Sequence, residues 1–212
     1  MKKFLVMSIV TIFTVHIVGA QESKSDYSGG LHFGLKAGFN RSNLYDSKTQ
    51  DFSYNPKFGF VGGAFLAIPL GKYFGVQPEV LFSQKGFKAS GVTLGQPYNF
   101  TRTTNYIDVP IFLAIIPSPY VTILAGPQFS YLTSQKDVFD NTLYSSSQEQ
   151  QFHNTNLRKN MLGFVGGLDF NLASAVIGTR IGWDVQSNNG DGSSSVPNYK
   201  NVWLQLTLGF RF

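Results

Sequence analysis

The sequence predicts an all-β protein: an eight-stranded antiparallel up-and-down transmembrane β-barrel, preceded by a cleavable signal peptide. Only 14% of the 212 residues are charged, whereas a soluble domain carries about 25%. Eight segments alternate apolar and polar residues with the period of a β-strand. The connections between these segments are long and short in strict alternation, as in barrels with short periplasmic turns and long outer loops. Together these observations predict a barrel whose outer face meets lipid.

The first twenty residues have the pattern of a signal peptide. Lys2 and Lys3 precede the apolar run 4–18, and Gly19 and Ala20 supply small residues for cleavage. An uncleaved anchor is the alternative, but the run is short for a membrane span. We therefore predict a signal peptide at 1–20, a short periplasmic tail at 21–30 and the barrel domain at 31–212.

The mature chain carries no concentrated charge. Lys2 and Lys3 are two of the 17 basic residues, so cleavage leaves 15 basic against 12 acidic side chains. These charges are spread along the chain, which argues against a nucleic-acid partner. The absence of cysteine excludes a disulfide scaffold, a cysteine nucleophile and a cysteine-ligated zinc site.

The alternating segments each have 9 to 12 residues, close to the length that a tilted strand needs to cross a bilayer. In chain order the predicted strands are 31–39, 58–68, 74–85, 105–115, 120–131, 161–170, 175–186 and 201–212. The long connections are 40–57, 86–104, 132–160 and 187–200, and the short ones are 69–73, 116–119 and 171–174. Each short connection contains a compact turn signal, such as Pro69-Leu70-Gly71 or Pro117-Ser118-Pro119.

One face of the predicted strands is apolar and the other carries the charges. The last strand is typical, because Val202, Leu204, Leu206 and Leu208 alternate with polar residues and glycine. The charged register contains four basic and four acidic side chains: Lys36, Glu79, Lys85, Asp108, Asp169, Arg180, Asp184 and Arg211. The same register contains many of the strand glycines.

The alternation by itself allows two orientations. A lipocalin-like soluble barrel would place the apolar face inside. An eight-stranded barrel has an interior only just wide enough for side chains, so some forty apolar residues could not fit there. We therefore predict that the balanced charges form an ion-pair network that plugs the lumen, since buried charges are costly unless paired.

Aromatic residues at the strand ends predict the interfacial girdles of a membrane barrel. They are Phe39, Tyr73, Phe74, Tyr120, Tyr131, Trp183 and Phe212. Pro78, Pro110 and Pro127 lie inside predicted strands, although proline cannot donate to a β-ladder. We expect β-bulges to accommodate them.

Several stretches resemble a known family. The first strand reads Gly-Leu-Lys-Ala-Gly-Phe-Asn at 34–40 and is followed by Ser42, and residues 74–86 contain a Pro-Glu pair and a closing Lys-Gly. Tyr-Ile-Asp-Val-Pro at 106–110 and Ala-Gly-Pro at 125–127 come in the family's order. These stretches resemble the PorT-like outer-membrane β-barrel family of Gram-negative bacteria.

The resemblance covers residues from about 31 to the end of the chain. Arg180 stands where the family often has an arginine, whereas Ile181 replaces the usual aromatic neighbour. The terminal Phe212 is similar to the signal read by the outer-membrane assembly machinery. The resemblance implies the same outer-membrane barrel. The alternation of long and short connections then places both termini in the periplasm. Some family members belong to secretion systems, so a secretion-system partner is one implied possibility.

The candidate chemical groups predict no catalytic, cofactor or metal site. Glu79 and Asp108 could form an acid–base pair, but a salt-bridge network with Lys36, Arg180 and Arg211 is the favoured interpretation. His32 and His153 have no third ligand at a useful spacing. Residues 188–192, Asn-Asn-Gly-Asp-Gly, offer oxygen ligands for calcium, but a flexible loop is the favoured interpretation.

The leading functional hypothesis is a monomeric barrel, surrounded by outer-membrane lipid, that displays its outer loops for binding to an extracellular or secretion-system protein. The barrel would be the rigid scaffold, and the outer loops would be the variable part that binds. Phe139, Tyr144 and Phe152 in the longest loop are the predicted contact residues. The alternatives are a narrow pore for water or small ions, an accessory role in a secretion machinery, and a lipid A-modifying enzyme using His153 and nearby serines.

Overall fold

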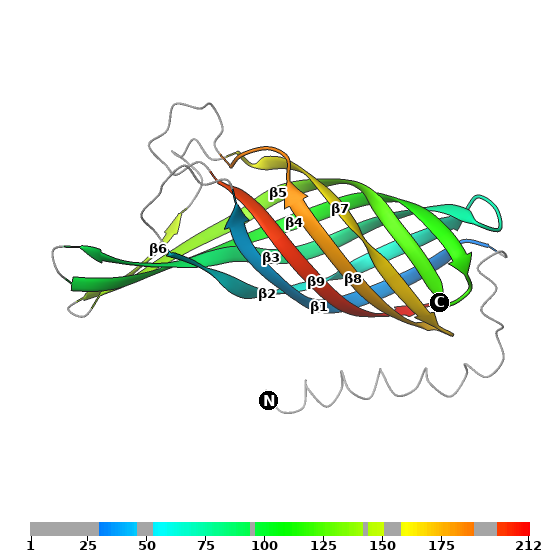
Figure 1. Ribbon diagram of the computed structural model, residues 1–212, viewed down its shortest axis with the longest axis horizontal. Helices are drawn as coiled ribbons and strands as arrows, with labels where there is room; N and C mark the ends of the chain where they lie inside the picture. Colours follow the sequence, from blue (N-terminus) through cyan, green and yellow to red (C-terminus); the bar gives the residue numbers. More distant parts are fainter. Residues whose placement is uncertain (1–29, 46–52, 94–95, 142–143, 151–157, 189–198) are drawn as a thin grey trace, which may run out of the picture.

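The computed structural model describes residues 30–45, 53–93, 96–141, 144–150, 158–188 and 199–212 (Figure 1). The predicted signal peptide and nearly all of the predicted N-terminal tail lie outside these residues. The described part contains strands β1 (His32–Tyr45), β2 (Ser53–Pro69), β3 (Phe74–Thr93), β4 (Gln96–Ser118), β5 (Val121–Asn141), β6 (Tyr144–Gln150), β7 (Asn160–Leu172), β8 (Ala175–Asp184) and β9 (Lys200–Arg211). These ranges contain no helix that is long and apolar enough to cross a membrane.

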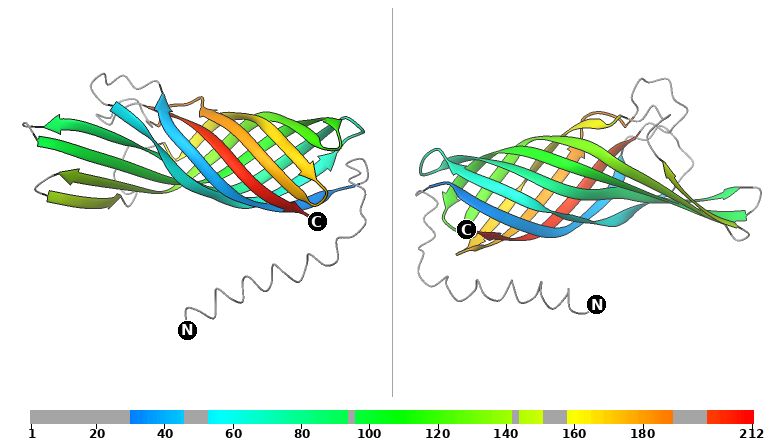
Figure 2. Two further views of the ribbon diagram at one scale, coloured as in Figure 1. Left: turned by 60° about the horizontal axis from the view of Figure 1, so that its bottom comes forward. Right: turned by 180° about the vertical axis from the view of Figure 1, so that it is seen from behind.

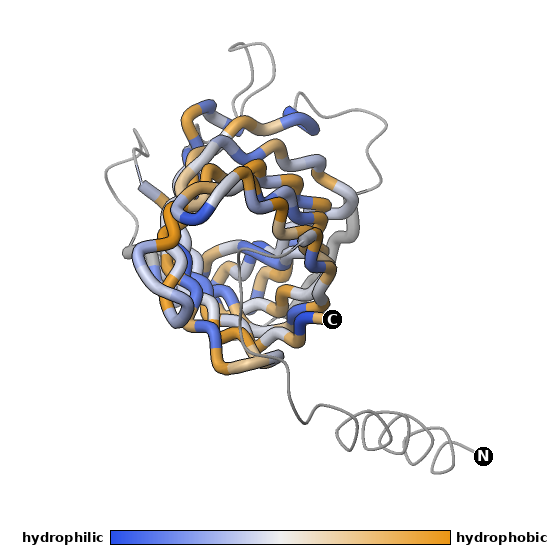
Figure 3. The backbone as a smooth tube through the Cα atoms, turned by 90° about the vertical axis from the view of Figure 1, so that its right-hand side faces the viewer, coloured by the Kyte–Doolittle hydropathy of each residue, from blue (hydrophilic) through white to orange (hydrophobic). Residues whose placement is uncertain are grey.

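Eight strands close into an antiparallel ring, which confirms the predicted fold class. The ring order is β4-β3-β2-β1-β9-β8-β7-β5, and pairing between β4 and β5 completes it. β1 and β9 join the two ends of the barrel through the register Gly34↔Arg211 to Tyr45↔Lys200. Figure 3 looks into the ring and shows hydrophilic and hydrophobic residues alternating along its strands.

Strand pairing extends well beyond the predicted outer ends. The expected loop 86–104 is wrong, because residues 86–93 belong to β3 and residues 96–104 to β4, and the two strands pair with each other. The expected loop 132–160 begins as the end of β5 and continues into β6, which pairs with β5 outside the ring. Apolar alternation marks only the part of a strand that faces lipid, whereas backbone pairing continues through polar residues.

These extensions form one structure, here called the outer sheet: residues 53–56 of β2, 87–93 of β3, 96–105 of β4, 134–141 of β5, and β6. Figures 1 and 2 show that it projects from one side of the barrel, past the ends of β1, β8 and β9. At about 3.3 Å per residue, the ten β4 residues add roughly 30 Å to the strand.

The opposite end of the barrel carries the three short turns. The start of β1 and the C-terminus lie at this end too (Figure 1), where the Phe212 amide donates to the Phe33 carbonyl over 2.8 Å. Both described chain ends therefore lie opposite the outer sheet.

The three interior prolines are accommodated without bulges, so that expectation is wrong. Register shifts occur between Pro56 and Val61 of β2, and between residues 105 and 106 and residues 115 and 118 of β4. Pairing lapses beside Pro78 and Pro110 but resumes in the same register, and it runs unbroken through Pro127↔Phe164. Proline's fixed φ lies close enough to extended geometry that only individual ladder bonds are lost.

The apolar register faces outward. Leu204, Leu206 and Leu208 are 53%, 56% and 64% exposed, whereas Glu79 and Arg180 are each 2% exposed. The seven aromatic residues expected at the interfaces are all exposed on the outer surface. Exposed apolar side chains in this number are favourable only against lipid. The core of the molecule is therefore its lumen.

Candidate functional site

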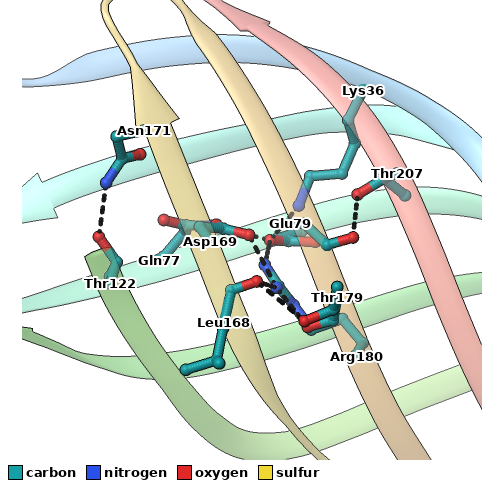
Figure 4. Close-up of polar contacts among 11 residues, drawn as sticks. Lys36, Gln77, Glu79, Thr122, Leu168, Asp169, Asn171, Thr179, Arg180 and Thr207 are labelled. Atoms are coloured by element: carbon teal, nitrogen blue, oxygen red, sulfur yellow. Dashed lines mark hydrogen bonds and ion pairs between the residues drawn. The ribbon is translucent and has the colours of Figure 1, made fainter. Parts of the chain in front are cut away.

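Four charged side chains form a connected network near the middle of the lumen (Figure 4). Lys36 Nζ lies 2.6 Å from Glu79 Oε1, and Arg180 contacts the same oxygen over 3.5 Å. Arg180 also lies 2.7 Å from Asp169 Oδ1. The Gln77 amide donates to both Glu79 and Asp169. Two cations and two carboxylates, all buried, thus neutralise one another across the barrel.

Glycines on neighbouring strands make room for these long side chains. Lys36 stands between Gly63 of β2 and Gly209 of β9. Arg180 is opposite Gly167, and Asp169 is opposite Gly178. A Cβ at Gly178 would lie 2.6 Å from Thr207 Oγ1 and 2.8 Å from Asp169 Oδ1. The network therefore depends on small neighbours within the narrow lumen.

A second ion pair joins Lys85 and Asp108. Their nearest atoms are 3.0 Å apart, and the Lys85 ammonium lies 3.7 Å from the centre of the Trp203 ring, a cation–π contact. Nearby on the lumen face, Asp184 accepts hydrogen bonds from the Asn201 backbone and side-chain amides over 3.0 and 2.6 Å. Each of these buried carboxylates has a donor.

An apolar layer also occupies the lumen. Phe112, Ala114, Leu124, Val165 and Trp203 form one buried cluster, and the Arg180 guanidinium lies 5.2 Å from the centre of the Phe112 ring. A Cβ at Gly182 would lie 2.3 Å from the Trp203 ring, so this tryptophan also fills space left by a glycine. Charged and apolar side chains together leave the cylinder packed.

A cluster of side chains lies at the outer mouth of the barrel, at the base of the outer sheet. We define this mouth cluster as Phe87, Ala89, Phe100, Arg102 and Tyr199. Arg102 binds both carboxylate oxygens of Asp137 over 2.8 Å each, the paired geometry that gives a strong charge-assisted contact. Although burial disfavours the charge, Tyr199 and Asp137 raise the pKa of Arg102 above its usual value.

Tyr199 links the mouth cluster to the segment before β9. Its ring packs edge-on against Phe87 at 5.4 Å, and its hydroxyl accepts a hydrogen bond from Arg102 over 3.5 Å. Its backbone is held twice by Asn188, over 3.0 and 3.1 Å. The cluster therefore ties together β3, β4 and the chain between β8 and β9.

The structure places all eight candidate lumen charges inside the barrel, but it does not join them in one network. Lys36, Glu79, Asp169 and Arg180 converge, whereas Lys85 pairs separately with Asp108. The expected grouping of Asp108 and Arg211 with Glu79 is therefore not found. Arg211 donates to the Ala173 carbonyl over 3.0 Å at the short-turn rim.

The mouth cluster is what sequence reasoning missed. Arg102 and Asp137 lie in segments expected to be loops. The signal was present in the alternation of Arg102, Thr104, Tyr106 and Asp108, which continues the lumen register of β4 outward. That alternation is polar, so a search for apolar faces does not detect it.

The predicted surface contacts fall in or near the outer sheet. Phe139 of β5 stacks on Tyr98 of β4 at 5.1 Å. Tyr144 begins β6 and pairs through its backbone with Asn141, but its side chain lies outside the described part. Phe152, His153 and most of 188–192 also lie outside the described residues. Within the described ranges, no group of three His, Cys, Asp or Glu is placed to hold a metal ion.

Comparisons with known proteins agree with this geometry. A family model described as outer membrane protein beta-barrel domain matches residues 19–190. The crystal structure of Ail, the attachment invasion locus protein of Yersinia pestis, superposes with a TM-score of 0.50 at 16% identity, covering 86% of this chain and 99% of Ail. At this identity the likeness concerns the fold alone.

Two further solved structures are similar. Neisserial surface protein A matches with a TM-score of 0.47 at 11% identity, covering 85% of this chain and 97% of its own. OprG from Pseudomonas aeruginosa matches with a TM-score of 0.41 at 12% identity, covering 87% and 97%. No curated protein matches the sequence.

Proposed function

Because the chain belongs to the outer membrane protein beta-barrel domain family, we propose that it is a closed scaffold that displays its outer sheet for binding at the cell surface. The protein is a transmembrane β-barrel of the outer membrane of a Gram-negative bacterium. Its family consists of small barrels that are generally non-enzymatic.

The packed lumen is the observation that carries this proposal. Lys36, Glu79 and Arg180 meet across it with side chains at most 3% exposed, and the apolar layer around Phe112 and Trp203 lies beside them. Opening a path would separate buried ion pairs, which costs several kcal/mol for each unpaired charge. A sealed barrel therefore supports display of the outer sheet rather than conduction of water or ions.

The orientation follows from the connections. Barrels of this kind place short turns in the periplasm and long connections outside. The outer sheet then stands outside the cell, and both termini are periplasmic. The stacked Tyr98 and Phe139 would be part of the displayed surface.

Planar-bilayer recording tests the sealed lumen. The purified full chain should show no steady conductance. Arg180→Ala removes the side chain that takes part in two of the three ion pairs of the network and should produce at least transient openings if the network is the seal. A reproducible open level from the unaltered chain would overturn the closed scaffold and favour the narrow pore for water or small ions.

Replacing residues 136–156 with a short Gly/Ser linker tests whether the outer sheet is displayed for binding. The variant should keep barrel assembly, measured by heat-modifiable migration on gels, but lose surface-dependent adhesion or partner capture. Replacing 189–198 in the same way is the matched control. If the 136–156 variant kept every surface-dependent phenotype, the β5–β6 part of the outer sheet would not be the binding surface.

The narrower PorT-like assignment leads to an additional proposal. If the chain serves a secretion machinery, as some members of that family do, it should co-purify with envelope proteins after mild crosslinking. Loss of those partners in the 136–156 variant would identify the outer sheet as the contact. Retention of the partners would place the contact elsewhere on the barrel.

A further inference from the structure

The strand pairing changes register at the level where the outer sheet leaves the ring. Residues 57–60 of β2 lie opposite residues 84–86 of β3, so β2 carries one residue in excess and the register of this pair shifts. Between β4 and β5 the register shifts at residues 105 and 106, where Thr133 of β5 is in excess. An extra residue of this kind bends its strand and increases the local twist.

These two shifts lie at one level of the barrel. Gln84 of β3 is opposite Asn105 of β4, and Asn105 is opposite Ser134 of β5. The Gln84 amide donates to Asn105 over 3.0 Å, and the Asn105 amide donates to Ser134 over 2.7 Å. We define this level as the transition row: residues 57–60 of β2, 84–86 of β3, 105 and 106 of β4, and 133 of β5.

β3 and β4 cross the transition row as a continuous pair. Their register runs without a shift from Leu81↔Asp108 to Thr93↔Gln96. Within this pair, β3 departs from ordinary strand geometry at Gly86, whose φ of +146° is one that L side chains rarely adopt. The outer sheet is therefore joined to the ring by one continuous ladder, while the ladders on both sides of it shift.

The Ser42 hydroxyl connects β1 to β3 at this row. It accepts a hydrogen bond from the Gly86 amide over 2.9 Å and donates to the Gly86 carbonyl over 2.8 Å. The Lys57 carbonyl of β2 lies 3.3 Å from the same hydroxyl oxygen. Ser42 is 0% exposed. One buried side chain thus serves both backbone groups of Gly86, at the point where pairing between β2 and β3 shifts.

Asn40 connects the same two strands on the ring side of Ser42. Its amide donates to Ser83 Oγ over 2.9 Å and to the Gln84 carbonyl over 3.2 Å. Asn40 is the cross-strand partner of Gly59 of β2, and the missing side chain there leaves room for the amide to reach β3. β1 therefore holds β3 directly, across the intervening strand.

The mouth cluster holds the next residue of β3. Phe87 packs against Tyr199, which precedes β9, and Leu44 of β1 packs against the same cluster. Gly86 and Phe87 are thus two adjacent points at which β1 and the segment before β9 hold the base of the outer sheet. Past this level the outer sheet projects beyond the ends of β1, β8 and β9 (Figure 2).

We infer that the outer sheet pivots on the barrel at the transition row, and that the Ser42 hydroxyl is the latch that holds it in the described position. Hinges in proteins are a few residues that absorb changes of backbone angle, and Gly86 and the shifted ladders supply them here. Opening the latch breaks hydrogen bonds to one residue, whereas bending within the ring would break regular ladders. The pivot lets the outer sheet adjust to a partner while the ion-pair network stays closed.

Distances between spin labels, measured by electron paramagnetic resonance on the full chain in nanodiscs, test the latch. The chain has no cysteine, so Asn99→Cys in the outer sheet and Val185→Cys just beyond β8 give a unique pair at exposed positions. Ser42→Ala should widen and shift the distribution of this distance, because the outer sheet loses a tie to β1. Ser130→Ala is the matched control, since this buried lumen serine accepts from Gln128 within β5, and it should change nothing. An unchanged distribution in Ser42→Ala would overturn the latch.

A second label pair separates the latch from the stability of the ring. Ile111→Cys of β4 and Leu204→Cys of β9 are exposed positions within the ring. Their distance distribution should be the same in Ser42→Ala as in the chain with an unaltered Ser42. If it widened together with the first pair, Ser42 would be a general support of the ring, and the latch assignment would fail.

Hydrogen exchange of the unaltered chain tests the pivot without any substitution. Each opening exposes the Gly86 amide, whose partner is the Ser42 hydroxyl, while the ring amides of β3 at 80–82 stay paired. The Gly86 amide should therefore exchange at least about tenfold faster than those amides, because a single net hydrogen bond protects weakly. Equal protection would show that Gly86 opens only when the ring opens, and it would overturn the pivot. Neither outcome depends on what the outer sheet binds.

Discussion

At the scale of single residues, the lumen is organised by charges and the glycines beside them. Arg180 touches both Glu79 and Asp169 and is 2% exposed, so its charge is compensated almost entirely by protein groups. Breaking a buried pair by removing one partner typically costs about 3–5 kcal/mol, because the remaining charge stays buried.

Arg180→Met should therefore destabilise the barrel by about 3–5 kcal/mol. The substitution leaves two buried carboxylates with Lys36 as their only cation in the network. Ile181→Met is the matched control, because the neighbouring side chain faces lipid and is 53% exposed; it should cost about 1 kcal/mol or less. Urea unfolding in lipid vesicles measures both, and equal stability of the two variants would contradict a structural role for the network.

Adjacent glycines in β7 offer a sharper test of packing. A Cβ at Gly167 would lie 2.0 Å from the Thr179 carbonyl oxygen and 2.7 Å from Arg180 Cδ, whereas at Gly166 the nearest atom would be 3.8 Å away. Gly167→Ala should cost about 1–3 kcal/mol through overpacking, and Gly166→Ala should be nearly neutral. Thermal unfolding followed by circular dichroism measures the difference. Similar melting temperatures for the two variants would show that the β7 backbone shifts to accommodate the added methyl group at little cost.

At the scale of elements, β3, β4 and β5 each extend through two parts of the molecule, the barrel and the outer sheet. Their inner parts wall the lumen, and their outer parts build the outer sheet. The mouth cluster marks the boundary, because the Arg102–Asp137 pair joins β4 to β5 and Tyr199 joins them to the start of β9. The outer sheet beyond this boundary contributes little to the lumen contacts that hold the ring.

Shortening the β3–β4 hairpin tests this division. Replacing residues 91–98 with Asn-Gly joins Ser90 to Asn99, which are cross-strand partners, through a two-residue turn favoured in hairpins. The barrel should fold with unfolding free energy within about 1 kcal/mol of the unaltered chain, since surface changes away from packed features have small effects. A folding defect as large as that of Arg180→Met would show that the hairpin tip stabilises the ring.

At the scale of the whole molecule, closure of the ring leaves no unpaired edge within the barrel. β1 pairs with β9 and β4 pairs with β5, so the backbone groups in the apolar belt are satisfied internally, as hydrocarbon requires. The lumen set of four cations and four carboxylates is neutral as a unit.

Closure predicts heat-modifiable migration. The purified chain should run faster in detergent gels before boiling than after, because the hydrogen-bonded ring resists detergent until heated. Asp108→Asn, which leaves Lys85 buried without its partner, should lower the temperature of the mobility shift by several degrees. Identical mobility with and without boiling would contradict a closed ring in solution.

The sequence alone determined the strand count of the ring, the outward face and the residues of the lumen, because period-2 alternation follows directly from the geometry of a strand. It also identified Lys36, Glu79, Asp169 and Arg180 as lumen residues, without showing which of them would be in contact. Alternation places a side chain on a face but says nothing about its neighbours around the ring.

Only the tertiary structure decided those neighbours. The stagger of the strands brings Lys36 of β1 to Glu79 of β3 and separates Asp108 into a pair with Lys85. It also decided where the strands end, since residues 87–93, 96–105 and 134–141 pair as strands although no sustained alternation of apolar residues marks them. The physical reason is that register and strand extension are set by backbone hydrogen bonds between distant segments, whereas the hydropathy of a sequence records only which solvent each side chain meets.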